Sequence, residues 1–412
     1  MDSEILIIGA GIVGIAAAAR LAEEGHRVLV VDEQGICEGT SSGNAGALAF
    51  SDILPMASKG ILAKVPGWLV DPLGPFTIRP SYMPQLAPWL YRFWRASRPA
   101  MLAATARTQG EMMRLAEPEF LELAERAGIA GMIRHDGSLE LYESEREWNA
   151  SLPGWDVRRE AGIGFRHLRG NALEECQPGL DRRFIIGTFV PGWKTVSDPK
   201  QIGKGLWDHA QRLGAVFRQA RAMSVEHAPA GAQATMADGS ILRAGKIVVA
   251  AGAWSHRLAK GLGDIIPLET ERGYNTTLPA GAFDLRRQLI FSGHGFVVTP
   301  LETGIRVGGA VELGGLALPP NYARAAAMLS KAQKFLPGLK SEGGRQWMGY
   351  RPSLPDSLPV IGRSRNSPHV LYAFGHGHLG LTQSAATARL VGDLVAGRQP
   401  AIALDPFNPQ RF

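Results

Sequence analysis

The first forty residues alternate between short apolar runs and one long alanine-rich segment. Residues 5–8 (ILII) form a continuous apolar run, which is typical of a strand buried on both faces of a parallel sheet. Residues 12–25 (IVGIAAAARLAEEG) predict a helix that ends at Gly25, because glycine favours the end of a helix. A further apolar run at 27–33 (RVLVVDE) predicts the next strand. The pattern therefore predicts one β–α–β unit.

Later segments extend this prediction. Residues 138–144 (SLELYES) alternate like a sheet strand, and 245–255 (GKIVVAAGAWS) predict a buried strand that ends on glycine. Strand-like runs dominate from 262 to about 345, and the chain ends in a strand, a glycine loop and a helix. These elements predict an α/β protein.

Composition narrows the class of protein. The 412 residues are 45% hydrophobic, which is enough for a substantial core in two or three domains. The formal charge of +6 comes from scattered residues and favours a solvated basic surface over nucleic-acid binding. Cys37 and Cys176 exclude a disulfide scaffold and lack metal-ligand spacing. With no signal-peptide pattern and no apolar run of about 18 residues, we expect a cytoplasmic protein.

The first glycine loop predicts a dinucleotide site. Gly9, Gly11 and Gly14 form G-x-G-x-x-G between a predicted strand and helix, and Asp32 ends the next strand. That is the full context of the dinucleotide-binding fingerprint. Its glycines let the backbone approach the pyrophosphate at the N-terminus of the helix. Asp32 or Glu33 would then bind the ribose hydroxyls.

A second glycine pattern, GHGHLG at 375–380, precedes only a helix and a short tail. A second mononucleotide unit would need another parallel strand, so one extended cofactor that reaches both loops is the better interpretation. FAD has that length, and a helix starting near Thr382 would direct its positive end at the N1–C2=O edge of the flavin.

Two other motifs carry less weight. His376 and His378 are two residues apart, but no third ligand stands at a suitable spacing, so we expect no metal site. Residues 39–43 (GTSSG) match the hydrolase motif G-x-S-x-G, but the required strand and helix do not flank them.

Six segments in this order resemble the FAD-dependent D-amino acid dehydrogenase and glycine oxidase group, a D-amino acid oxidase-like family. They are GAGIVG (9–14), GTSSGNAG (39–46), KIVVAAGAWS (246–255), GIRVGGAVE (304–312), GYRPSLPDSLPVIGR (349–363) and GHGHLGLT (375–382). TSSGNAG and the proline-rich segment are closer to the bacterial dehydrogenases than to the soluble oxidases.

The resemblance implies noncovalently bound FAD and a set of residues along it. Near the pyrophosphate and flavin ring it implies Ser41, Ser42, Asn44 and Gly46. Met223 would offer backbone contacts to the adenine, and Gly252 and Trp254 would close over the cofactor. The last glycine loop would contribute Gly377, Gly380, Leu381 and Thr382.

The resemblance also implies a substrate anchor. Arg351 in GYRP stands where the family holds the substrate carboxylate, and a guanidinium binds a carboxylate through two parallel hydrogen bonds. Where glycine oxidases use a tyrosine, this chain has Phe296. We therefore take Tyr274 as the candidate second partner and include His294 and His378 among the candidate catalytic residues.

Together these inferences predict a two-domain α/β (α+β) protein. A Rossmann-type FAD-binding domain with a parallel sheet would comprise residues 1–60, 191–261 and 346–412. A substrate-binding domain with a mostly antiparallel sheet would comprise residues 61–190 and 262–345.

The expected reaction is oxidative deamination of a D-amino acid, including proline-like ones such as D-proline or hydroxy-D-proline. A hydride would pass from Cα to flavin N5, and the electrons would go on to a quinone or another non-oxygen acceptor. One alternative is a glycine or sarcosine oxidase that passes electrons to oxygen and produces hydrogen peroxide. Another is a non-catalytic dinucleotide-binding regulatory module. The sequence leaves the oligomeric state open.

Residues 83–101 bear on the electron acceptor. Trp89, Leu90, Phe93 and Trp94 recur at helical spacing with arginines among them. This face would pack on the sheet domain, which we favour, or lie on a membrane surface as a peripheral contact on the inner face of the cytoplasmic membrane.

Overall fold

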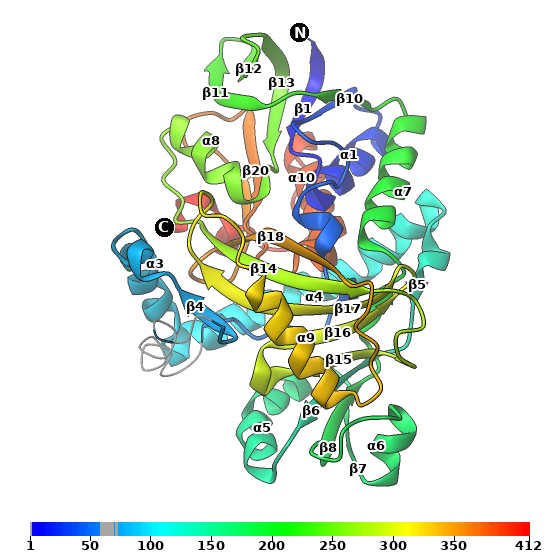
Figure 1. The fold of residues 1–412 in the computed structure, drawn as a ribbon. Coiled ribbons are helices and arrows are strands. Elements are labelled where there is room, and N and C mark those ends of the chain that lie inside the picture. The colour runs from blue at the N-terminus through cyan, green and yellow to red at the C-terminus, as the bar shows by residue number, and fades with distance from the viewer. Residues whose placement is uncertain (1, 58–69, 71–72) are drawn as a thin grey trace.

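The computed structural model describes residues 2–57, 70 and 73–412. Within them, two large sheets carry the fold, and a small three-stranded sheet accompanies them. In Figure 1 the first sheet stands in the upper half of the molecule, and the second crosses its middle and lower parts.

Parallel strands form the centre of the first sheet. Its order is β10–β2–β1–β13–β12–β11, and β20, followed by β19, continues from β13. The strands are β1 (Ser3–Ile8), β2 (Val28–Asp32), β10 (Val216–Gln219), β11 (Ala222–Ala228), β12 (Gly231–Met236), β13 (Ile241–Val249), β19 (Val360–Arg363) and β20 (Val370–Phe374). The pairs β10–β2, β2–β1, β1–β13 and β13–β20 are parallel. The predicted strands at 5–8 and 27–33 are thus confirmed.

Both faces of this sheet are covered. Ile5 and Ile7 of β1 enter one hydrophobic core with α1, α4, α7 and α10, whereas Leu6 and Ile8 enter another with α8 and the β11–β12 hairpin. Side chains of a strand alternate between faces, so a strand of apolar residues throughout needs cover on both sides. The helices are α1 (Ile12–Glu23), α4 (Pro99–Ala127), α7 (Pro199–Arg212), α8 (Ser255–Gly261) and α10 (Gly380–Ala396).

Small side chains line the contact between α1 and α10. Residues 16–19 of α1, all alanines, are fully buried, and Ala385, Ala386 and Ala388 of α10 lie in the same core. As predicted, α1 ends just before Gly25, whose φ of +85° is one that glycine adopts without strain.

The second sheet is mostly antiparallel. Its order is β18–β14–β17–β16–β15–β6–β8–β7, with β4 beside β17; only β15–β6 and β17–β4 are parallel among its described pairs. The strands are β4 (Phe76–Ile78), β6 (Ser138–Tyr142), β7 (Arg166–Arg169), β8 (Ile186–Val190), β14 (Glu269–Leu278), β15 (Gln288–Phe291), β16 (Phe296–Leu301), β17 (Gly304–Leu313) and β18 (Arg345–Ser353). Helix α9 (Ala323–Phe335) packs on β14 and β17. The predicted α/β class, with one parallel and one mostly antiparallel sheet, is confirmed.

The remaining elements complete the chain. A small sheet joins β3 (Ala47–Leu48), β9 (Lys194–Val196) and β5 (Ile133–Arg134). Helices α5 (Glu145–Glu160) and α6 (Asn171–Cys176) accompany the lower strands in Figure 1, and α3 (Met83–Ala96) lies at the left of that view. None of the described helices combines the length and apolar character that a membrane crossing requires.

The predicted domain ranges stay a prediction, and two elements bear on them. Helix α4 falls in the range 61–190, yet its buried face joins the core of the first sheet. Strand β18 begins at the predicted boundary but pairs with β14 along its whole length, so it belongs to the second sheet. The predicted boundary at residues 60 and 61 lies outside the described residues.

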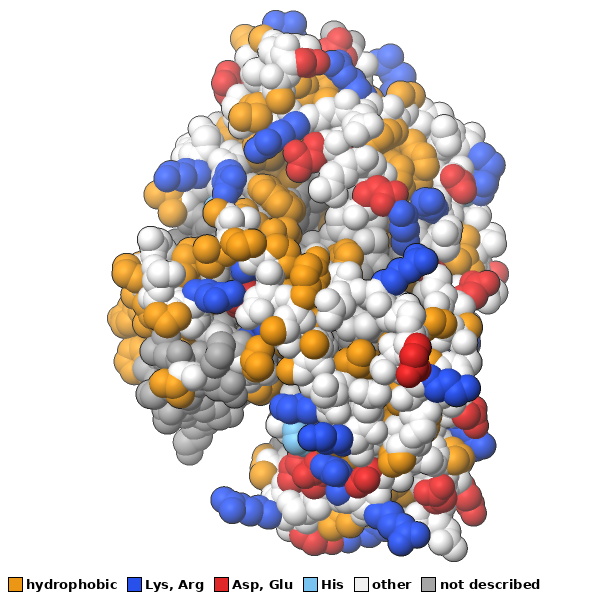
Figure 2. Space-filling view, viewed as in Figure 1, with side chains coloured by type: hydrophobic (Ala, Val, Ile, Leu, Met, Phe, Trp, Pro, Cys, Tyr) orange, Lys and Arg blue, Asp and Glu red, His pale blue; other side chains and the backbone are white. Residues whose placement is uncertain are grey.

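Helix α3 divides the aromatic residues of 83–101 between core and surface. Trp89, Leu90 and Phe93 are buried in one cluster with Ile78 and Leu313, as expected of a face that packs on the sheet domain. Tyr91 and Trp94 are 57% and 39% exposed. Figure 2 shows orange side chains gathered at the left of this face, where α3 lies.

Candidate active site

A cavity of about 1400 Å³ lies between the two sheets. The loops that follow β1, β2, β13 and β20 line it from one side, and β14, β17 and β18 line it from the other. In open parallel sheets, ligands bind outside the carboxyl ends of the strands. The fold therefore puts this cavity where such a sheet places its ligand, with the second sheet as a cover.

The three glycines of the first loop differ in whether the protein has room for a side chain at their positions. Gly9 has a φ of +111°, and a Cβ there would overlap the carbonyl group of Ala250. A Cβ at Gly14 would overlap the carbonyl oxygen of Gly9. Gly11 has φ −69° and ψ 172°, which suit any residue, and its Cβ would make an ordinary contact with Ser41 Oγ at 3.4 Å. The protein itself thus requires Gly9 and Gly14, whereas a small side chain at Gly11 would meet no overlap within the protein and would stand on the cavity wall.

Asp32 supports this loop. Its Oδ2 accepts a hydrogen bond from the backbone N–H of Ala10 at 2.8 Å, and its Oδ1 accepts one from Gln34 N–H at 2.8 Å. Both Asp32 and Glu33 line the cavity. One carboxylate at the end of β2 therefore fixes the glycine loop while facing the space beside it.

The segment 39–46 brings small polar groups to the tip of α1. Ser41 Oγ accepts a hydrogen bond from the N–H of Ile12 at 3.0 Å, so its hydroxyl lies at the positive end of this helix. Asn44 Oδ1 accepts from Gly46 N–H at 2.8 Å. Ser41 and Asn44 line the cavity.

Helix α10 directs its N-terminal turn at the same cavity. Thr382 Oγ1 accepts a hydrogen bond from Ala49 N–H at 3.0 Å and donates to Ala47 O at 3.3 Å, which ties the helix to β3. Gly377, with a φ of +54°, makes the turn before it. The positive ends of α1 and α10 thus meet one cavity, a suitable place for a ligand with negative or electron-accepting groups.

Most of the predicted cofactor residues surround this cavity. Its lining includes Gly9, Gly11, Asp32, Glu33, Ser41, Asn44, Met223, Gly252, Trp254, Gly377, Gly380, Leu381 and Thr382. Gly14, Ser42 and Gly46 are not among the lining residues. The hydroxyl of Ser42 donates to Gly39 O at 2.9 Å, so it shapes the loop instead of facing the cavity.

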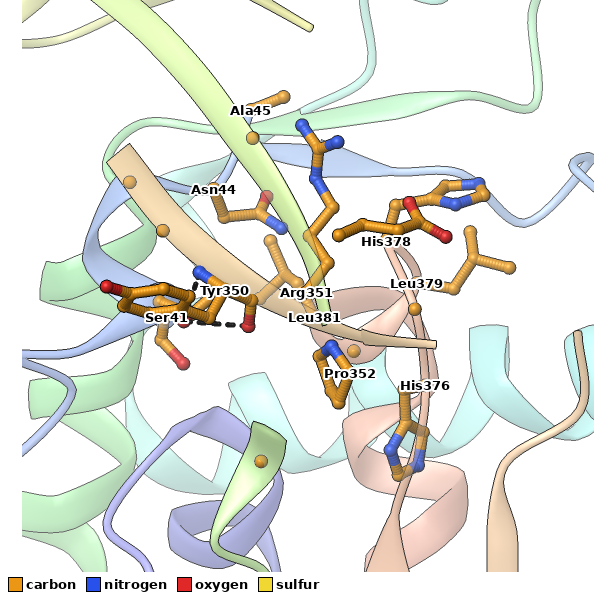
Figure 3. Close-up of a pocket in the computed structure, with 18 of the residues that line it drawn as sticks. Ser41, Asn44, Ala45, Tyr350, Arg351, Pro352, His376, His378, Leu379 and Leu381 are labelled. Atoms are coloured by element: carbon orange, nitrogen blue, oxygen red, sulfur yellow. Dashed lines mark hydrogen bonds between the residues drawn. The ribbon is translucent and has the colours of Figure 1, made fainter. Parts of the chain in front are cut away.

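Arg351 enters the cavity from β18. Its Nη1 donates to Ala310 O at 3.0 Å and its Nη2 to Gly309 O at 3.5 Å, which leaves three of its five N–H donors for a ligand. Burial lowers the pKa of this guanidinium, while the charge of Glu271 opposes that shift. In Figure 3 its side chain rises from β18 to lie between Ala45 and His378.

Glycine at position 273 leaves room for the guanidinium of Arg351. A Cβ on Gly273 of β14 would overlap Cζ of Arg351. The side chain of Arg351 therefore lies across the neighbouring strand at Gly273 and holds its charged group against the cavity wall.

Tyr274 is among the residues that line the cavity, but its hydroxyl is engaged elsewhere, and His294 lies outside the lining. The Tyr274 hydroxyl donates to Glu312 Oε2 at 2.5 Å and accepts from Asn321 N–H at 3.1 Å, so it is engaged on the α9 side of β14. His294 Nε2 lies 3.0 Å from Glu143 Oε1, and its ring packs on Phe335. Alternation along β14 explains the first result, because the side chains of Glu271 and Asn275 face the cavity while the ring of Tyr274 packs in the core of the second sheet.

His378 does line the cavity, as part of a charged cluster. Its Nε2 lies 3.2 Å from Asp52 Oδ2, and Arg158 Nη2 lies 3.6 Å from Asp52 Oδ1. Burial lowers the pKa of His378, but the hydrogen bond and charge of Asp52 outweigh it and raise that pKa overall. Burial raises the pKa of Asp52, but His378 and Arg158 outweigh it and lower that pKa. A charged imidazole beside a carboxylate is therefore favoured at this wall.

Sequence reasoning missed several cavity residues. Glu271 and Asn275 line it from β14, Asp52 from a loop, and Arg158 and Trp155 from α5. The alternation of β14 would have put Glu271 and Asn275 on one face with Gly273. No sequence signal places α5 near the cavity, because its approach depends on the packing of the second sheet.

Comparison with known proteins agrees with this architecture. The family described as FAD dependent oxidoreductase matches residues 4–394. A protein named D-amino-acid oxidase from Bradyrhizobium diazoefficiens is 36% identical over 99% of this chain and 98% of its own length. A protein named D-amino acid dehydrogenase from Rhizobium johnstonii is 31% identical over 97% of each chain.

Solved structures share the fold. Glycine oxidase from Geobacillus kaustophilus matches with a TM-score of 0.76 and 23% identity over 100% of this chain and 99% of its own. L-Proline dehydrogenase from P. horikoshii matches with a TM-score of 0.75 and 20% identity over 100% and 98%. The absence of a side chain at Gly11, beside the tip of α1, fits a bound dinucleotide. Since the family match spans residues 4–394, the chain belongs to the FAD-dependent oxidoreductase family and is an FAD-dependent enzyme.

Proposed function

We propose that this enzyme oxidises the Cα–N bond of a D-amino acid and deaminates it. The observation that carries the proposal is Arg351, a half-buried guanidinium with free donors on the wall of the FAD cavity. A carboxylate is the natural partner of that group. The names of the relatives at 36% and 31% identity, D-amino-acid oxidase and D-amino acid dehydrogenase, support the same class of substrate.

For the cofactor, we infer that the pyrophosphate lies at Gly11 and Ser41, at the tip of α1. Asp32 or Glu33 would bind the ribose, Met223 would border the adenine, and the turn at Gly377–Thr382 would lie at the flavin. These assignments follow the cavity lining and the preference of helix N-termini for negative charge. Gly252 and Trp254 would close over the cofactor from the loop after β13.

For the substrate, Arg351 would fix the carboxylate and so orient Cα. FAD, held by the loops after β1 and β20, would supply the two-electron acceptor for the hydride of Cα. The imine so formed from the substrate would hydrolyse in water to an oxo acid and ammonia, or stay cyclic for D-proline or hydroxy-D-proline. The protein would contribute position and charge stabilisation. The amine has to be neutral when it reacts.

For the acceptor, we propose a quinone or another non-oxygen carrier and a cytoplasmic location. Oxygen is the second candidate, which the name of the 36% identical relative favours.

The first prediction tests the cofactor site. Gly11→Val should abolish FAD retention, because the side chain would occupy the space of the pyrophosphate. The apoprotein should keep its thermal stability, since the backbone of Gly11 suits any residue. The measurements are the absorbance near 450 nm and the melting temperature without FAD. Gly164→Val, in an exposed loop with nothing near its Cβ, is the control and should stay yellow; a yellow, fully loaded Gly11→Val protein contradicts the assignment.

The second prediction tests the reaction and its anchor. Anaerobic addition of D- and L-amino acids, with D-proline and hydroxyprolines in the panel, should bleach the flavin for at least one D-amino acid. Arg351→Leu should raise KM and lower kcat, at a cost of about 2–5 kcal/mol in kcat/KM, and Arg351→Lys should recover only part of this.

Arg345→Leu is the matched control, because Arg345 lies on the same strand but is exposed and outside the cavity. It should behave as the wild type. Near-normal kcat/KM for Arg351→Leu would place the carboxylate anchor elsewhere.

The third prediction concerns the acceptor. With one substrate at saturation, the enzyme should reduce a quinone or an artificial dye much faster than it consumes oxygen. The comparison needs an oxygen electrode and a dye assay on the same preparation. Peroxide formation at the rate of dye turnover would assign the enzyme to the oxidases.

The fourth prediction concerns membrane contact. The exposed side of α3 carries Tyr91, Arg92, Trp94 and Arg95, and we propose that it meets anionic lipid. The protein should float with anionic liposomes at low salt and not at high salt. Replacing Tyr91 and Trp94 by serine should abolish flotation without loss of flavin. A wild-type protein that stays unbound at low salt contradicts the contact.

A further inference from the structure

Two opposite charges stand next to each other on the cavity wall and do not pair. Glu271 of β14 and Arg351 of β18 are directly opposed in the antiparallel register, where Cβ atoms lie about 4.5–5.5 Å apart. Both line the cavity. Yet no ion pair within 4.0 Å joins them among the described residues, because Arg351 turns toward Gly273 and donates to Ala310 and Gly309.

Glu271 is nearly inaccessible, and one of its carboxylate oxygens lacks a hydrogen-bond partner. Its side chain belongs to a residue that is 1% exposed, and its Oε1 accepts no hydrogen bond from any described residue. A buried carboxyl oxygen without a hydrogen bond is costly, and native proteins satisfy most such groups. A ligand that brings a donor to this point would remove the cost.

The other buried carboxylates of this sheet region have their partners within the protein. Glu312 accepts from Arg79, Arg272 and Tyr274. Glu269, two residues before Glu271 on β14, accepts from Tyr82 and from Thr270 N–H. Of these three carboxylates, Glu271 is the one that lines the cavity and the one with an oxygen that accepts no hydrogen bond, which points to a ligand.

We propose that Glu271 binds the amino group of the substrate while Arg351 binds its carboxylate. An α-amino acid carries its N–H donors and its carboxylate on one carbon, so it can bridge a carboxylate and a guanidinium that are neighbours but stay apart. The inference rests on the proposed function and narrows the substrate to acids whose amine keeps at least one N–H when bound. Glu271 is then a specificity-determining residue that distinguishes amino acids from plain carboxylic acids.

The test compares two ligands that differ only in the amine. On yellow holoenzyme, the KM of the best amino acid is measured beside the Kd of its desamino counterpart, propionate for alanine or cyclopentanecarboxylate for proline, from the change in flavin absorbance. Glu271→Gln should raise the amino acid KM roughly ten- to hundredfold, the range of a lost hydrogen bond to a charged group. The Kd of the desamino acid should stay the same or fall, since a nearby negative charge is gone.

Glu269→Gln is the matched control, because Glu269 lies on the same strand outside the cavity lining. The ratio of the amino acid KM to the desamino acid Kd should be the same in this variant as in the wild type. Equal losses for both ligands in Glu271→Gln would mean that Glu271 only positions Arg351, and no change in either would mean that it does not touch the amine. Both outcomes overturn the proposal. If Glu271→Gln loses FAD, the same comparison on Glu271→Asp decides, and a parallel change again overturns it.

Failure of the proposed function is visible separately, as wild-type flavin that no amino acid bleaches. In that case the ratio of alanine to propionate affinity, read from flavin absorbance, still tests Glu271.

Discussion

Close packing between α1 and α10 determines where the chemistry of this enzyme can take place. The two helices come from opposite ends of the chain, and their contact consists of alanines and other small residues. Such side chains allow helix axes to approach at the short end of the usual range. Because both helices start at the carboxyl edge of the same parallel sheet, their positive ends meet at one point. The cofactor cavity is a result of that meeting.

The second sheet contributes β18, the strand that carries Arg351. Strand β18 leaves this sheet and leads into β19 of the first one, so it passes directly over the cavity. The hydroxyl of Thr40, in the loop that borders α1, accepts from Tyr350 N–H at 3.2 Å and donates to Tyr350 O at 3.1 Å. The residue before Arg351 is thereby tied to the loop beside the helix tip. The proposed substrate anchor and the loop at the tip of α1 are thus held in one frame by the hydroxyl of Thr40.

The sequence predicted the parts of this arrangement that depend on local patterns. The strand–glycine–helix unit at 5–25 and the late glycine loop are set by residues a few positions apart, and the structure has the helices and turns there. Tyr274 and Glu271 show the limit. They are three residues apart on β14, across a register shift between Arg272 and Tyr274, and only the assembled sheet decides which of them faces the cavity. Likewise, the face of α4 that packs on α10 could not be assigned to the first sheet, because an amphipathic helix does not encode its partner.

The position of the Arg351 guanidinium depends on Gly273, because the guanidinium occupies the space that any side chain at position 273 would fill. An arginine at 351 is therefore an incomplete signature of this site. A homologue with the same arginine but a larger residue at 273 would have to place the guanidinium elsewhere, either toward Glu271 or further into the cavity. If the proposed site is right, the informative unit for recognising it in other genomes is the triplet of Glu271, Gly273 and Arg351, on two paired strands that are some seventy-eight positions apart in the chain.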